Sequence, residues 1–112
     1  MGYPRLYRTQ WSKVQARFLP LALPTPEKIQ HHTATGLPNS GDIVGFMQRL
    51  EAGEMAREPG LIAIGYQWLV VGGGKYEGWQ IEGRGWGVQG GATLHHNSVS
   101  HAIAMIGNYH AT

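Results

Sequence analysis

Glycine is the residue type that most constrains the fold of this chain. Seventeen of the 112 residues are glycine, roughly twice the usual share, and most of them divide the second half into short segments. The triplet at 72–74 ends Ile64–Val71, a run of β-branched and aromatic residues typical of a strand. Lys75–Ile81 then predicts the returning arm of a hairpin, whereas the glycines between 83 and 91 leave the following stretch too flexible for a regular element.

One amphipathic helix is expected between the first two strands. Its apolar residues recur at i, i+3, i+4 and i+7, which places them on one buried stripe: Ile43, Phe46, Met47 and Leu50. Gln48, Arg49 and Glu51 are expected to point outward. Ser40 or Asp42 can cap the helix, because their side-chain oxygens accept the first free backbone donors.

Two further strands and an irregular leader complete the expected order of elements. Ile29–Thr33 predicts a short strand, and Ala102–Ile106 is an apolar strand of the kind covered on both faces. Residues 1–28 are expected to be an irregular basic leader, because four prolines prevent a long helix. Residues 29–112 then form part of one α/β domain, a mixed β-sheet flanked by helices.

Charge and composition exclude several classes of protein. The net charge is only +2, although Arg5, Arg8, Lys13 and Arg17 all precede the first acidic residue, Glu27. This basic arm suits either an anionic partner or a solvated segment packed over a sheet, and the second interpretation is favoured because no nucleic-acid motif follows it. No apolar run approaches the ~20 residues of a membrane span or forms a secretory signal. Neither a nucleic-acid partner nor a membrane is therefore expected.

Histidine is the residue that raises the question of a metal. The chain has six histidines and no cysteine, so a zinc site could use no thiolate from this chain. A catalytic zinc site needs three protein ligands and a water, yet the histidines show no HExxH-type spacing. Spacing alone therefore favours surface or packed histidines. A site built from those present, such as His31 with His96 or His101, is the third-ranked alternative.

Five motifs follow one another over nearly the whole chain: Arg8-Thr9-Gln10-Trp11, His31-His32-Thr33-Ala34, Ile64-Gly65-Tyr66, Glu82-Gly83-Arg84-Gly85-Trp86 with Val88-Gln89-Gly90, and Asn97-Ser98-Val99-Ser100 with Ile106-Gly107-Asn108-Tyr109. In this order and spacing they resemble the motifs of the peptidoglycan-recognition protein and N-acetylmuramoyl-L-alanine amidase family, the type 2 amidases. The resemblance implies a peptidoglycan-recognition/amidase-like fold that lacks the C-terminal helical part.

The resemblance also implies a function and its residues. His31 matches a zinc ligand, and Tyr66 matches the catalytic tyrosine that stabilises the zinc-bound water and the developing oxyanion. The bond cut would join N-acetylmuramic acid to L-alanine in bacterial peptidoglycan. Positions that match the groove for the stem peptide are His32, Thr33, Arg84, Trp86 and Asn97. Gly85-Trp86 favours a stem peptide that carries diaminopimelate, whose extra carboxylate suits a nearby arginine.

Three departures from the family pattern leave two hypotheses about the function. Ala92 stands where a groove histidine is usual, Gly78–Ile81 resembles an insertion, and the chain stops at Thr112, before the family's remaining zinc ligands. The first hypothesis is a zinc-dependent amidase, for example a bacteriophage endolysin that is carried by a virion or released from the cytoplasm onto the cell wall. The alternative is a non-catalytic module that binds peptidoglycan, such as a part of a phage tail or another larger assembly.

Overall fold

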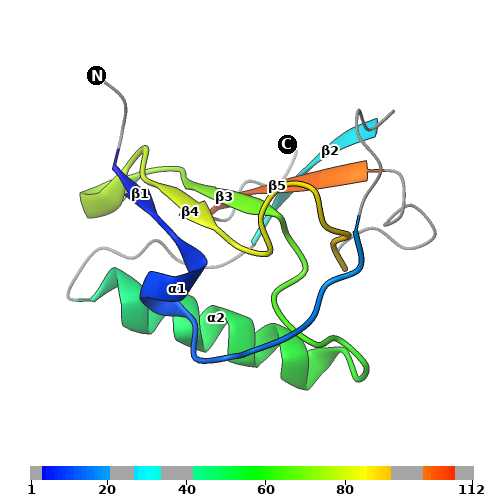
Figure 1. The fold of residues 1–112 in the computed structure, drawn as a ribbon. Helices are drawn as coiled ribbons and strands as arrows, with labels where there is room; N and C mark the ends of the chain where they lie inside the picture. Colours follow the sequence, from blue (N-terminus) through cyan, green and yellow to red (C-terminus); the bar gives the residue numbers. More distant parts are fainter. Residues whose placement is uncertain (1–3, 21–26, 34–41, 92–99, 108–112) are drawn as a thin grey trace.

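A mixed five-stranded β-sheet is the centre of the computed structural model, which describes residues 4–20, 27–33, 42–91 and 100–107 (Figure 1). The strands are β1 (Arg5–Leu6), β2 (Glu27–His32), β3 (Trp68–Val71), β4 (Gln80–Glu82) and β5 (Ser100–Ile106). Their order across the sheet is β1-β4-β3-β5-β2. Strands β3, β5 and β2 are parallel, and β4 runs antiparallel to β3. The predicted fold class is therefore confirmed. Strand β5 contains the predicted strand Ala102–Ile106, but only its alternate residues Ala102, Ala104 and Ile106 are buried, so the expected cover on both faces is incomplete.

The main helix, α2 (Ile43–Arg57), packs along one face of this sheet (Figure 1). Of the two candidate caps, Asp42 begins the helix: its Oδ1 accepts a hydrogen bond from the backbone N–H of Val44 at 3.0 Å. The predicted apolar stripe is confirmed. It meets Leu69, Val71, Ile81 and Ile106 of the strands in one core.

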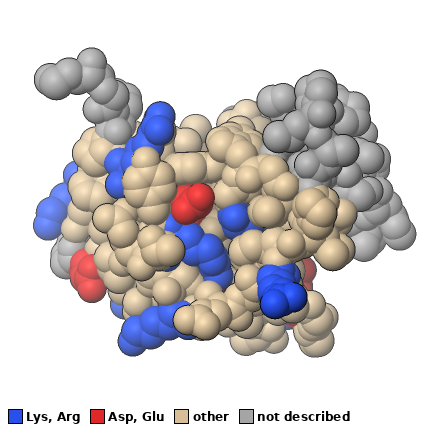
Figure 2. All heavy atoms as spheres, viewed as in Figure 1, with Lys and Arg blue, Asp and Glu red and all other residues tan. Residues whose placement is uncertain are grey.

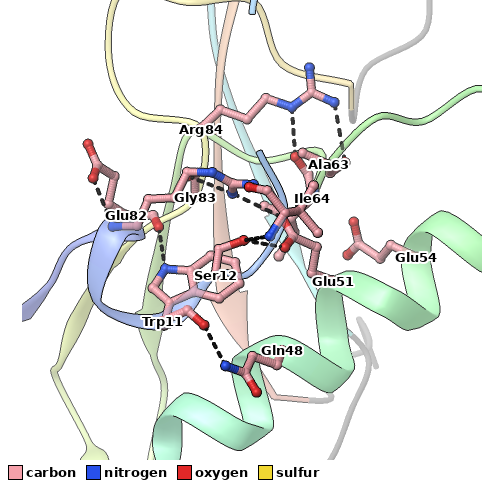
Figure 3. A network of polar contacts seen from close by, with 12 residues as sticks. Trp11, Ser12, Gln48, Glu51, Glu54, Ala63, Ile64, Glu82, Gly83 and Arg84 are labelled. Atoms are coloured by element: carbon pink, nitrogen blue, oxygen red, sulfur yellow. Dashed lines mark hydrogen bonds and ion pairs between the residues drawn. The ribbon is translucent and has the colours of Figure 1, made fainter. Parts of the chain in front are cut away.

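Glu51 is the residue of α2 that the sequence analysis placed wrongly. It was expected to point outward, but it is only 1% exposed. Glu51 follows Met47 by one turn, so the helical period carries it onto the buried face. Three contacts compensate its charge there (Figure 3): the Ser12 hydroxyl donates at 2.6 Å, the Ile64 amide donates at 3.0 Å, and Arg8 forms an ion pair at 2.9 Å.

The leader is also more ordered than expected, at least over its first part. Strand β1 and the one-turn helix α1 (Arg8–Trp11) both lie within residues 1–28. Trp11 is 1% exposed, its indole N–H donates to Glu82 O at 2.7 Å, and Gln48 donates to its carbonyl at 2.8 Å (Figure 3). Prolines exclude a long helix here. The single turn of α1 is instead stabilised by tertiary packing of the buried Trp11 indole.

The hairpin of β3 and β4 is confirmed, with the 3₁₀ turn η1 (Gly74–Tyr76) between its arms. Its first arm is shorter than predicted, because Ile64–Gln67 does not join the ladder. The backbone of that segment instead binds the loop at 83–91: Arg84 N donates to Tyr66 O at 2.9 Å, and Gly91 N to Gly65 O at 2.8 Å. A side chain at Gly83 would stand 2.1 Å from Tyr66 O, which explains glycine at this position.

Candidate functional site

His31 and Tyr66 lie together on the structure, as the amidase hypothesis requires. His31 is near the end of β2 and Tyr66 lies two residues before β3, yet their ring centroids are 5.6 Å apart, with the planes tilted by 52°. Strand β5 runs between these two elements, and the residue paired with His31 is Ala104. Its short side chain leaves room on that face for two rings. Sequence positions 35 residues apart are thus brought into one site.

Tyr66 is held in its neutral form by its surroundings. Burial raises the pKa of the Tyr66 phenol to about 12, and the negative charges of Glu54 and Glu58, with a hydrogen bond to Glu54, add to the shift. Burial likewise raises the pKa of Glu54, whose Oε1 accepts a hydrogen bond from Gly65 N at 3.2 Å. At neutral pH the phenol is therefore a hydrogen-bond donor, which is the state needed to stabilise a developing negative charge on a substrate oxygen.

Thr33 anchors the His-His-Thr segment to β5. Its backbone N–H donates to Met105 O at 3.0 Å, and its hydroxyl oxygen accepts from Gly107 N at 3.1 Å. His32 is the last residue of β2, but its side chain lies outside the described part of the chain, as does Asn97. The proposed peptide-binding roles of these three residues remain predictions.

Arg84 has a structural use that the sequence did not reveal. Its guanidinium donates to Ile64 O at 2.7 Å and Ala63 O at 3.3 Å (Figure 3). It also donates to a third backbone carbonyl, Gln89 O, at 3.1 Å. Burial lowers the pKa of this guanidinium, and the charge of Arg8 lowers it further. Arg84 therefore ties the 83–91 loop to the segment that leads into Tyr66, whereas contact with a substrate carboxylate stays a prediction.

Among the predicted groove residues whose side chains the structure describes, Trp86 is the most exposed. Its side chain is 49% exposed, and it follows Gly85, whose φ of +93° lies in the left-handed region that glycine favours. The Trp86 ring lies 6.3 Å from that of Trp68, which in turn meets Tyr7 edge-on at 6.4 Å. Three aromatic side chains from α1's N-cap, β3 and the 83–91 loop thus lie in a row.

A complete metal site is not present in the part of the chain that the structure describes. There, no three histidine, aspartate or glutamate side chains are close enough together to hold one ion. His31 fits a single zinc ligand, because it is half-exposed and offers an imidazole nitrogen. His96 and the side chain of His101, the alternative ligands, lie outside the described residues. The role of His31 as a zinc ligand therefore stays a prediction.

Two residues of the site escaped the sequence analysis. Glu54 follows Ile43 and Leu50 at helical spacing, so extending the apolar stripe by one turn would have placed it on the buried face. Gln67 is fully buried, and its side chain accepts from Ala102 N at 2.7 Å and donates to Val88 O at 3.0 Å. No sequence periodicity indicates that a side chain will form hydrogen bonds to both a strand and a loop, as that of Gln67 does.

Basic side chains do not gather into a single stripe over the described surface in view. Lysines and arginines are distributed over several parts of this face (Figure 2). Arg8, from the basic arm, is largely buried against Glu51. Among the described helices, none is long and apolar enough to cross a membrane.

The comparisons with known proteins agree with this geometry. No family model matches the sequence. A human N-acetylmuramoyl-L-alanine amidase is 33% identical over 116 residues, which cover 99% of this chain and 19% of the human protein. Bumblebee PGRP-SA, a peptidoglycan recognition protein, has a TM-score of 0.80 at 30% identity, covering 98% of this chain and 64% of that chain. PGRP-SA of Apis mellifera has a TM-score of 0.77 at 33% identity, covering 93% and 61%.

The mixed sheet and its long helix thus have the fold of the peptidoglycan recognition proteins. Sequence and structure together place the chain in the peptidoglycan-recognition protein and N-acetylmuramoyl-L-alanine amidase family. The chain spans between 60% and 64% of these solved relatives. None of the similar proteins cited here is a phage protein, and the predicted phage origin has no support from them.

Proposed function

We propose that this chain takes part in zinc-dependent hydrolysis of the amide bond between N-acetylmuramic acid and L-alanine of bacterial peptidoglycan. The observation that carries the proposal is the His31–Tyr66 pair, with ring centroids 5.6 Å apart. A metal-binding imidazole beside a protonated phenol is the arrangement that amide hydrolysis at a zinc ion needs. The human relative that bears the name of this activity adds support.

The residues of the chain would divide the work as follows. When bound, zinc polarises the scissile carbonyl and lowers the pKa of its water to about 7. His31 would provide one ligand, and the other ligands would come from outside the described residues. Tyr66, whose pKa of about 12 keeps it protonated, would donate a hydrogen bond to the carbonyl oxygen as negative charge develops on it.

The proposed partner is the stem peptide of the bacterial cell wall. Human PGRP-Iβ has been solved with a muramyl pentapeptide and Drosophila PGRP-LB with tracheal cytotoxin. The exposed ring of Trp86 offers a surface against which such a peptide can pack. His32, Thr33, Arg84 and Asn97 are the further candidates for contact, and the Gly85-Trp86 pair favours a stem peptide that carries diaminopimelate.

A non-catalytic recognition module is the second candidate. It is favoured by the fact that His31 is joined by no two other ligands within the described ranges. Such a module would bind peptidoglycan through the same groove, without hydrolysis. Its binding would not depend on zinc.

Zinc content and amide cleavage decide between the two candidates. The chain is dialysed against trace zinc and analysed for the metal, and the release of free alanine amino groups from peptidoglycan is measured in parallel. The amidase proposal expects about one zinc per chain, lost in His31→Ala. It also expects kcat to fall by about 10²–10³-fold in Tyr66→Phe, with Tyr76→Phe as the matched control. Saturable binding that resists chelators, without cleavage, would establish the recognition module instead.

A further inference from the structure

The N-terminal arm, residues 12–20, runs beside the loop that carries Trp86. Gln89 N donates to Leu19 O at 2.8 Å, and the Gln89 side chain donates to Pro20 O at 3.5 Å. Pro20 and Val88 form an antiparallel bridge. The arm and the 83–91 loop are therefore joined through their backbones at the end of the arm, although more than sixty positions separate them in the sequence.

Phe18 joins the same two segments through its side chain. The guanidinium of Arg84 lies over the Phe18 ring at 5.0 Å from its centroid, and the guanidinium of Arg8 lies over it at 5.4 Å. Guanidinium groups are attracted by the negative face of an aromatic ring, most strongly where water is excluded. Arg84 is half-buried and Arg8 largely buried, so this condition is met.

Further contacts hold the side chains of both arginines in place, so the Phe18 ring connects two anchored side chains. Arg8 is paired with Glu51 of α2 and donates to Gly83 O at 3.2 Å. Arg84 donates to Gln89 O within the 83–91 loop and to Ile64 O in the segment that leads into Tyr66. The Phe18 ring thus lies where the helix, the loop and the arm converge. The face of the ring also attracts the guanidinium groups of Arg8 and Arg84, whose like charges repel each other.

The 83–91 loop depends on contacts with other segments, because its glycines do little to restrict its own backbone. Five of its nine residues are glycine, and Gly85 and Gly87, on the two sides of Trp86, both have positive φ. Glycine backbones lose more conformational freedom on ordering than others, so contacts from outside must hold the loop in one conformation. The contacts beyond Trp86, at Val88 and Gln89, come in part from the arm.

We propose that Phe18 is a positioning residue, which holds the 83–91 loop through Arg84 and so fixes Trp86 in the orientation that binds ligand. The identity of that ligand, a muramyl peptide, rests on the proposed function. The arm then contributes to affinity without touching the ligand. An aromatic ring is required at position 18, and an aliphatic side chain of similar size does not replace it.

The test compares Phe18→Leu with Phe18→Trp and with Leu19→Ala in the whole chain. Leu19→Ala is the matched control, because it removes a 67% exposed side chain from the same arm. The first readout is the indole N–H signal of Trp86 in the unliganded protein, assigned through Trp86→Phe. The second is the affinity for a soluble muramyl tripeptide that contains diaminopimelate. Urea unfolding of each variant verifies that it is folded.

The expected result is a shifted or broadened Trp86 signal in Phe18→Leu, with affinity about tenfold weaker, equivalent to about 1.4 kcal/mol. Phe18→Trp and Leu19→Ala are expected to match the wild type in both measurements. A wild-type Trp86 signal in a folded Phe18→Leu would overturn the proposal, as would an equal effect of Leu19→Ala. If the wild type binds no muramyl peptide, the proposed function fails, while the Trp86 signal still decides whether Phe18 positions the loop.

Discussion

Replacement of Arg8 by methionine would leave the buried Glu51 carboxylate without its cation. The Glu51 side chain is 2% exposed and that of Arg8 13%, at a separation of 2.9 Å. Removing one partner of such a pair costs about 3–5 kcal/mol, because the remaining charge stays buried. Loss of the hydrogen bonds from Arg8 to Gly83 O and Val14 O adds about 0.5–1.5 kcal/mol each. The variant should therefore lose a large part of the 5–15 kcal/mol typical of a domain.

Urea unfolding, followed by tryptophan fluorescence, measures this effect in a double-mutant cycle. The double variant Arg8→Met with Glu51→Met removes both charges, and it should recover about 3 kcal/mol relative to Arg8→Met alone. Arg5→Met is the control, because Arg5 is exposed and its side chain bonds Gln80 at the surface, and it should change stability by less than about 0.5 kcal/mol.

The reasoning fails if Arg8→Met costs less than about 1 kcal/mol, the value usual for an exposed pair. It also fails if the cycle shows no coupling between the two positions. A changed slope of the unfolding free energy against urea would indicate a different denatured state rather than a lost ion pair. Added salt should have little effect on the coupling, since buried charges are weakly screened.

Three smaller perturbations test other parts of the structure. Tyr66 should titrate near pH 12 by phenolate absorbance. Because the pKa of an unfolded tyrosine is about 10, the stability of the fold should fall as the pH rises from about 10 to 12. Glu54→Gln should lower the pKa of Tyr66 in the folded protein, and an unchanged pKa in that variant would contradict the environment assigned to Tyr66. Gly83→Ala should cost about 1–3 kcal/mol in urea unfolding, since its Cβ would meet a carbonyl, whereas Gly53→Ala inside α2 should stabilise by about 0.5–1 kcal/mol. Asp42→Ala should cost about 0.5–2 kcal/mol through loss of the N-cap, measured in the same way.

The elements that periodicity or composition predicted are those in which side-chain burial alone decides the structure. Strand β5 and helix α2 have continuous apolar patterns, so their places followed from the sequence. Glu51 was misplaced because a charged side chain suggested the surface, although its helical phase indicated the core. Its burial depends on partners that are distant in the sequence, the Ile64 amide 13 residues away and Ser12 and Arg8 39 or more residues away.

The parts that could not be predicted depend on backbone contacts between distant segments. Ile64–Gln67 has the composition of a strand, but its carbonyls are taken by the 83–91 loop. Strand β1 has two residues, too few for any alternation to be recognised. For the candidate site, resemblance identified His31 and Tyr66, and the structure brought them together. The neighbouring Glu54, which perturbs Tyr66, carries no motif of its own.

The strand order has a consequence for how the chain is made. The two outer strands, β1 and β2, come first in the sequence, and each pairs with a strand made later. Strand β2 pairs only with β5, which leaves the ribosome roughly 70 residues later, a delay of about 3–14 s at ~5–20 residues per second. Throughout this interval β2 has no strand to pair with, and His31 is not yet held in the candidate site. Folding of this sheet therefore waits for nearly its last described residues, and a truncation before Ser100 should leave β2 without the strand it binds.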